Sequence, residues 1–238
     1  MVLPKEITVP FRSEDIPFID AGTVPTTSGG TLRAGYARIS TKGGVFSAVN
    51  TDTEINAREI HVIIVGANPK LSKTWYAKEW SDDDKPSAPD CFSLDGVTPD
   101  LSIEVPQHHI CVTCPQNAWG SRITDKGQQV KACSDQKRLA VVMHDNPSGE
   151  VLLLQVTPGS LKGLNQYQKQ LSVRGIPPEI VKTKISLDPS SEYPKLVFTF
   201  AGFLDEETQS IVDDLFGSAL VRHITGEKQP IKQGLKNE

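Results

Sequence analysis

The chain has 238 residues, 37% of them hydrophobic, and a formal net charge of −4. These values are typical of a folded globular protein and argue against an intrinsically disordered chain. The longest apolar run, VLLLQV, is far shorter than the roughly 20 residues that cross a bilayer, and the first residues show no basic-then-apolar signal pattern. We therefore expect a cytoplasmic protein without a membrane segment.

The charges are unevenly distributed along the chain. Residues 82–100 and residues 205–214 each carry a charge of −5, so the rest of the chain is positive by +6. An acidic protein can therefore still present a basic face to a nucleic acid. The alternative is an ordinary solvated surface with no ligand.

The first half of the chain predicts an irregular arm followed by a sheet. Residues 1–30 mix proline, threonine and glycine without a period. Strands are expected at 32–40 and 43–50, joined by a turn at 41–44, and a third strand at 58–68 is apolar enough to be buried on both faces. Together they predict a curled antiparallel sheet.

The next segment, PKLSKTWYAKEW, interleaves aromatic and basic side chains. The aromatic residues are Trp75, Tyr76 and Trp80, and the basic ones are Lys70, Lys73 and Lys78. Aromatic rings stack on bases while lysines neutralise phosphates, so the mixture suits a single-stranded nucleic acid. The alternative is that these rings cover the core beside a short helix.

All four cysteines fall in one segment with the spacing Cys-x19-Cys-x2-Cys-x18-Cys. They are Cys91, Cys111, Cys114 and Cys133. In a reducing compartment, clustered cysteines favour a metal over disulfides, and four thiolates match the tetrahedral preference of structural zinc. His108, His109 and His144 lie nearby, but four thiols suffice and we expect these histidines not to be ligands.

A catalytic role for this zinc is not expected. Zinc deaminases need a His-x-Glu pair and a Pro-Cys-x-x-Cys motif, whereas Val62 and Ile63 follow His61, and Ile110 precedes Cys111. A closed four-cysteine site leaves no position for an activated water. The chain also lacks a phosphate-binding glycine–lysine loop and a Gly-x-Ser-x-Gly elbow. We therefore predict a protein that is not an enzyme.

The second half predicts strands and two helices. Strands are expected at 137–145, 150–156, 181–188 and 193–203. The first two flank the hairpin signal Asn146-Pro147-Ser148-Gly149. Apolar residues at three- to four-residue spacing predict a helix at 160–175, and acids at its start support a second helix at 204–220.

These elements predict a mainly β, α+β fold with two helices. The expected architecture is an antiparallel barrel like the oligonucleotide-binding (OB) fold, with a zinc-binding insertion. The expected organisation is an irregular arm at 1–30, the barrel domain at 31–221 with its insertion at about 85–135, and a flexible tail at 222–238.

Several pieces of the sequence resemble a family of zinc-containing tailed-phage single-stranded DNA-binding proteins. They are KGGVFS, SKTWYAKEW, PDCFSLDGVTPD, CVTCPQNAWGS, KACSDQKRLAVV and LKGLNQYQKQLSVRGIPPEIVKTKISLD, and they span roughly residues 35 to 204. The resemblance implies an OB-type barrel, zinc on the four cysteines and the cytoplasm of a host cell. The polar tail GEKQPIKQGLKNE departs from the acidic tail with which such proteins recruit replication partners.

We therefore predict a protein that binds single-stranded DNA without strong sequence preference during phage replication or recombination. The expected DNA-binding residues are Lys70, Lys73, Trp75, Tyr76, Lys78, Trp80, Trp119, Arg122, Lys126, Lys131, Lys137 and Arg138. Trp119 has a second interpretation, as a lid on the zinc site. The alternative function is a phage-encoded interaction module that regulates a host enzyme. Replication or recombination proteins are candidate partners, and the sequence leaves the oligomeric state open.

Overall fold

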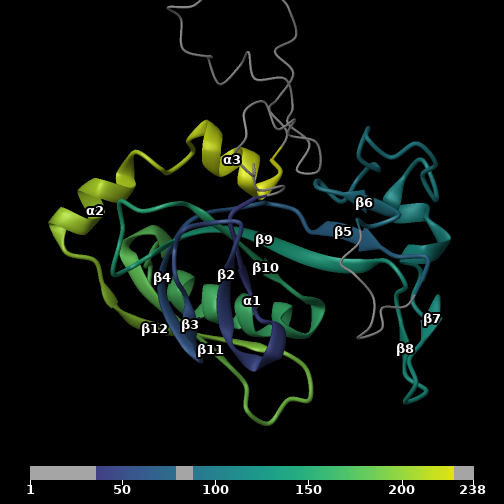
Figure 1. Ribbon diagram of the computed structural model, residues 1–238, viewed down its shortest axis with the longest axis horizontal. Coiled ribbons are helices and arrows are strands. Elements are labelled where there is room, and N and C mark those ends of the chain that lie inside the picture. Colours follow the sequence, from purple (N-terminus) through teal and green to yellow (C-terminus); the bar gives the residue numbers. More distant parts are fainter. Residues whose placement is uncertain (1–35, 79–87, 228–238) are drawn as a thin grey trace, which may run out of the picture.

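The computed structural model describes residues 36–78 and 88–227 (Figure 1). Its strands are β1 (Arg38–Ser40), β2 (Phe46–Val49), β3 (Asn56–Ala57), β4 (Glu59–Ala67), β5 (Ser72–Trp75), β6 (Cys91–Ser93), β7 (Arg122–Ile123), β8 (Gln129–Val130), β9 (Ser134–Met143), β10 (Leu152–Val156), β11 (Val181–Leu187) and β12 (Leu196–Phe203). Its α-helices are α1 (Pro158–Val173), α2 (Glu206–Asp213) and α3 (Ala219–Thr225). None of the helices within these ranges has the length and apolar content that a bilayer crossing requires.

Eight strands form one curled sheet in the order β12-β11-β4-β9-β10-β1-β2-β3. The curl gives a half-barrel, which is compatible with a barrel-like fold. The expectation of a purely antiparallel sheet was wrong, because β1 runs parallel to β10. Every other neighbouring pair on this path is antiparallel.

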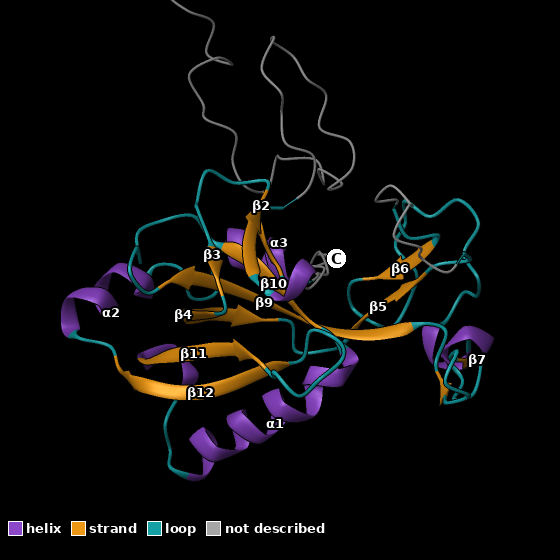
Figure 2. Ribbon diagram, turned by 60° about the horizontal axis from the view of Figure 1, so that its bottom comes forward, coloured by secondary structure: helices purple, strands orange, loops and turns teal. Residues whose placement is uncertain are grey.

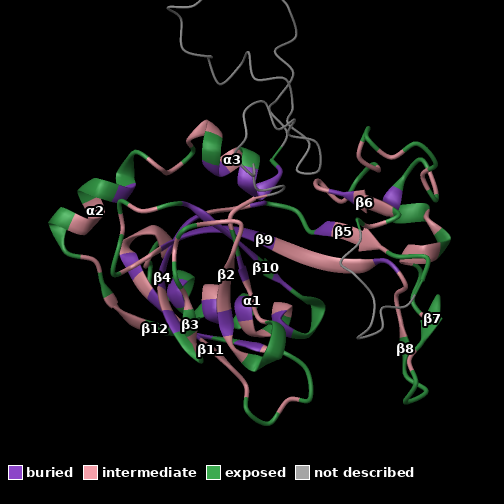
Figure 3. Cartoon of the chain, in the orientation of Figure 1, coloured by how far each residue is buried: buried purple, intermediate pink, exposed green. Residues whose placement is uncertain are grey.

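The sheet is covered by helices on both faces, so its central strands are apolar throughout. On β4, Ile60, Val62 and Ile64 face a core that includes Leu164 and Leu171 of α1. The alternate residues of the same strand face a second core, to which α2 and α3 contribute Val212, Val221 and Ile224. Figure 3 shows the buried residues gathered along the central strands and the inner side of α1. This burial confirms the prediction that the strand at 58–68 is covered on both faces.

The C-terminal helical region differs from the single helix expected at 204–220. The helix α2 ends at Asp213, and α3 begins after Ser218, whose side chain accepts a hydrogen bond from the Val221 N–H. Gly217 has a positive φ of 66°, which breaks the helix before this cap. The new helix continues to Thr225, past the boundary at 222 where we expected the tail to begin.

A smaller lobe holds all four cysteines, and we call residues 71–78 and 88–133 the cysteine module. Strand β9 joins it to the half-barrel, because its first residues pair with β5 and the rest of the strand pairs with β4 and β10 (Figure 2). The buried Asn68 side chain adds a second connection, donating to the Leu94 carbonyl at 2.8 Å and the Thr225 carbonyl at 2.9 Å. The alternative interpretation placed a short helix beside Trp75, but residues 72–75 form strand β5.

Candidate metal centre and basic surface

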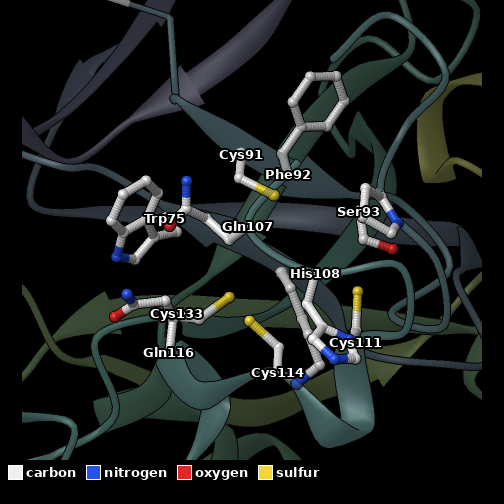
Figure 4. A pocket seen from close by; sticks show the side chains of 12 residues that line it. Trp75, Cys91, Phe92, Ser93, Gln107, His108, Cys111, Cys114, Gln116 and Cys133 are labelled. Atoms are coloured by element: carbon white, nitrogen blue, oxygen red, sulfur yellow. The ribbon is translucent and has the colours of Figure 1, made fainter. Parts of the chain in front are cut away.

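The four cysteines line one cavity although they come from distant parts of the sequence (Figure 4). Cys91 begins β6, Cys111 begins a 3-10 turn, Cys114 follows that turn, and Cys133 immediately precedes β9. Cys114 and Cys133 turn their sulfur atoms toward each other. The cavity volume is about 20 Å³, which corresponds to the space for one water-sized particle.

Backbone hydrogen bonds hold the cysteine-bearing loops in place. The Cys111 N–H donates to the Val97 carbonyl at 2.9 Å, and the Cys133 N–H donates to the Gln116 carbonyl at 2.8 Å. Cys91 pairs with Trp75 across the β5–β6 ladder. These bonds connect three separate chain segments around the cavity.

The module has almost no apolar core of its own. Between residues 88 and 133, the buried residues are Ser93, Cys111 and Cys133. A segment of this length cannot offset its loss of chain entropy with so little burial. The chemistry of the thiols is therefore the candidate source of its order.

None of the four cysteines forms a disulfide, and burial disfavours the thiolate form of two of them. Burial raises the pKa of Cys133 to about 11 and raises the pKa of Cys111, while the nearby Lys73 ammonium acts in the opposite direction. A bound divalent cation would reverse this balance, because it favours deprotonated ligands. Four soft donors around an ion-sized cavity fit structural zinc in number and chemistry. Among the described residues, however, no three His, Cys, Asp or Glu side chains have the arrangement of a preformed metal site.

The predicted non-ligand histidines lie at different distances from this cavity. His108 lines it, and its Nδ1 accepts a hydrogen bond from the Ile110 N–H at 3.1 Å. His144 lines a separate pocket together with His61, which lies near the start of β4. His109 is exposed.

A polar network lies beside the thiols. Lys73 also lines the cavity, and its Nζ donates to Asp135 at 2.5 Å and to Asn117 at 2.8 Å. Lys131 donates to the other oxygen of Asp135 at 2.9 Å. The Lys73 side chain is only 11% exposed. Lys73 and Lys131 therefore both bind Asp135 at the start of β9, and their contact with phosphates remains a prediction.

Comparisons of the chain with protein-family models, curated proteins and solved structures give no match. The resemblance to phage DNA-binding proteins remains a prediction. The function is therefore inferred from the side chains themselves.

The structure divides the twelve expected DNA-binding residues into distinct groups. The exposed members are Lys70, Tyr76, Lys78, Trp119, Arg122 and Lys126. Trp75 is half-buried and lines the cysteine cavity. Lys137 is also half-buried, and this burial lowers its pKa. Trp80 lies outside the described residues.

Arg138 does not have the exposed position that phosphate binding requires. It is only 6% exposed, and its Nη2 donates to the Ile224 carbonyl at 2.6 Å. Its guanidinium carbon lies 5.2 Å from the centre of the Tyr36 ring. This arginine joins β9 to the end of α3, a position that does not favour the predicted contact with DNA.

The sequence patterns did not indicate Arg38 or most of the exposed apolar side chains of the module. Arg38 is exposed on β1, close enough for its charge to act on the pKa of Tyr76, which burial raises. Exposed large hydrophobics of the module that the sequence did not indicate include Val97, Leu101, Val105, Ile110, Val112 and Ile123. Arg38 gave no signal because it stands alone among apolar and small residues, and the hydrophobic residues are scattered between prolines and polar residues.

Proposed function

We propose that this protein binds single-stranded DNA without strong sequence preference, with the half-barrel serving as an OB-type scaffold and the cysteine module contributing to the DNA-binding surface. The observation that carries the proposal is the exposed Trp119, whose side chain is 71% accessible, close in sequence to the exposed Arg122 and Lys126. Bases stack on such a ring while the cations neutralise phosphates.

The exposed end of β5 supplies a second set of groups of the same kind. Tyr76 is 50% exposed, Lys78 follows it, and Arg38 lies near the Tyr76 ring. Lys126 forms an ion pair with Glu192, and both side chains are highly exposed. Such a pair contributes little to stability, so the lysine can exchange Glu192 for a phosphate.

A structural Zn²⁺ belongs to this proposal, held by Cys91, Cys111, Cys114 and Cys133. Such an ion would supply four strong bonds in place of the missing apolar core. Its role is to fix the loop that carries Trp119 and the β7–β8 hairpin that carries Arg122. Ordered side chains lose less conformational entropy on binding, so the ion favours affinity indirectly.

The test is a fluorescence-anisotropy titration of labelled oligo-dT at several salt concentrations. Replacing Trp119 with alanine is expected to weaken binding roughly tenfold or more, because a stacked base contributes about 1–3 kcal/mol. Arg122→Ala is expected to lower the dependence of log K on log salt, since one phosphate contact is lost. Tyr193→Ala removes an exposed ring outside the module and serves as the matched control.

The exposed apolar side chains of the module favour one alternative, a protein-interaction module. Seven large hydrophobics are exposed within residues 97–123, and protein partners cover such side chains where they gather into one patch. Wild-type protein that fails to bind oligo-dT even at low salt would exclude the DNA proposal. A host protein retained after nuclease treatment, and lost with Trp119→Ala, would then support the alternative.

A further inference from the structure

Helix α1 presents one side to the core and the opposite side to solvent. Its buried residues, which recur every three or four positions, are Ser160, Leu164, Tyr167 and Leu171. The positions on the opposite side of the helix, all of them exposed, are Lys162, Gln166, Lys169 and Val173. The exposed Gln170 and Arg174 flank them, and we call these six residues the outer face of α1. Figure 2 shows α1 on the outside of the half-barrel, slanting away from the cysteine module.

The outer face carries positive charge that the described part of the chain leaves unneutralised. Lys162, Lys169 and Arg174 form no ion pair with any described residue. Residues 151–178 contain no aspartate or glutamate. Helix stability alone would favour acids in the first turn and acids four residues before a lysine. Because α1 has neither, the charge pattern is better explained by an anionic ligand than by the stability of the helix.

The spacing of the outer face fits an extended anion. Lys162 and Lys169 are seven residues apart, which is about 10 Å along the helix, and Arg174 lies about 8 Å further on. Gln166 and Gln170 lie between these cations, and amide side chains donate to phosphate oxygens. The single aromatic ring of α1 belongs to Tyr167 and is buried, so the face offers no stacking platform. This chemistry suits a row of phosphates whose bases are not contacted.

The outer face begins close to the proposed DNA contacts of the module. Lys126, in the turn of the β7–β8 hairpin, forms its ion pair with Glu192 in the loop before β12. Only four residues separate Glu192 from Leu196, so their Cα atoms lie within about 14 Å of each other. The Leu196 N–H donates at 2.9 Å to Oγ of Ser160, in the first turn of α1. The hairpin and the start of α1 therefore lie on either side of one short loop.

We propose that single-stranded DNA held at the cysteine module continues past the β7–β8 hairpin onto the outer face of α1, where Lys162, Lys169 and Arg174 hold its phosphates. This inference rests on the proposed function and extends the DNA-binding surface from one lobe to both. The module supplies stacking through Trp119, whereas α1 supplies charge without contact to the bases. A long strand therefore binds more tightly than a short one and with a steeper salt dependence.

The test compares two lengths of labelled oligo-dT, about 6 and about 25 nucleotides, in anisotropy titrations at several salt concentrations. The short strand reaches the module alone, and the long strand reaches α1 as well. Lys162→Gln combined with Lys169→Gln is expected to weaken binding of the long strand about tenfold. The slope of log K against log salt should fall by about 1.4 for that strand, since each single-strand phosphate contact contributes about 0.7. Binding of the short strand is expected to stay as in wild type.

Lys182 and Lys184 on β11 provide the matched control. Thr183 and Ile185 alternate with them and face α1, where Thr183 shares a hydrogen bond with Tyr167. Because side chains alternate along a strand, both lysines point to the other face of the sheet. Lys182→Gln combined with Lys184→Gln removes the same two charges and is expected to leave the salt slope unchanged for both strands. Circular dichroism confirms that all variants are folded.

The outcomes distinguish this inference from the proposed function. An α1 double variant that binds the long strand as tightly as wild type does, or as tightly as the β11 control does, would overturn the inference alone. Equal salt slopes of wild type for the short and long strands would also overturn it, because the long strand would then gain no phosphate contact. Wild type that binds neither strand would overturn the proposed function, and this inference with it.

Discussion

At the scale of single residues, the structure separates cations that face solvent from cations that serve the fold. Lys73 and Arg138 both belong to basic stretches of the sequence, yet one is bonded to Asp135 and Asn117 and the other to the Ile224 carbonyl. The sequence could not distinguish them from Arg122, because local composition does not show which side of a strand is covered. By contrast, the four cysteines were predicted to lie together, and they do line one cavity.

The position of Lys73 leads to a prediction about metal affinity. Four thiolates with a bound Zn²⁺ would carry a net charge of −2, which the Lys73 ammonium at the cavity wall would partly balance. Lys73→Met is therefore expected to weaken zinc binding by about tenfold or more, whereas Lys73→Arg retains most of the affinity. Competition with a chromophoric chelator measures the change.

The controls separate electrostatics from packing. Lys126→Met removes a charge from an exposed lysine outside the cavity and is expected to leave zinc affinity as in wild type. Equal affinities for Lys73→Met and Lys126→Met would contradict the role assigned to Lys73. Wild type that binds no zinc at all would instead contradict the metal site itself.

At the scale of elements, periodicity and turn chemistry predicted most strands and α1. The hairpin at Asn146–Gly149 is present between β9 and β10, with the Gly149 N–H donating to the Asn146 carbonyl at 3.0 Å. The parallel pairing of β1 with β10 was not predictable, because it depends on how the sheet curls rather than on either strand alone. The break before α3 had a local signal in Gly217 and Ser218 that the helical pattern obscured.

The packing of α3 on β4 depends on a glycine. A Cβ added at Gly66 would lie 2.2 Å from Val221 Cγ1, which is far inside van der Waals contact. Gly66→Ala is therefore expected to lower the free energy of unfolding by about 1–3 kcal/mol through overpacking. The double variant with Val221→Ala should lose less stability than the sum of the two single losses, because the clashing methyl groups are removed. Urea denaturation measures all three variants.

A second glycine provides the control for this element. Gly163 lies within α1, and its nearest atom to an added Cβ is the Leu196 carbonyl oxygen at 3.5 Å, an ordinary contact. Gly163→Ala is expected to be neutral or to stabilise by up to about 1 kcal/mol, because alanine favours the helix. Equal stability losses at Gly66 and Gly163 would show that α3 does not approach β4 as closely as described.

At the scale of the whole molecule, the half-barrel and the cysteine module differ in what stabilises each of them. The half-barrel has apolar cores on both faces of its sheet. The cysteine module is mostly exposed or half-buried (Figure 3), and between residues 88 and 133 its buried residues are a serine and two cysteines. Burial therefore accounts for the stability of the half-barrel but not for that of the module.

This difference predicts that metal removal unfolds one lobe and spares the other. Chelation of the zinc-loaded protein, or Cys111→Ser with Cys114→Ser, is expected to open the module while β4, β9 and β10 keep their protection against hydrogen exchange. Acidification should act in the same direction, because protons compete with the metal for the thiolates. Hydrogen exchange followed by mass spectrometry resolves the two lobes. Simultaneous loss of protection in both would instead mean that β9, which both lobes share, transmits the unfolding from the module to the half-barrel, and the metal would then stabilise the entire fold.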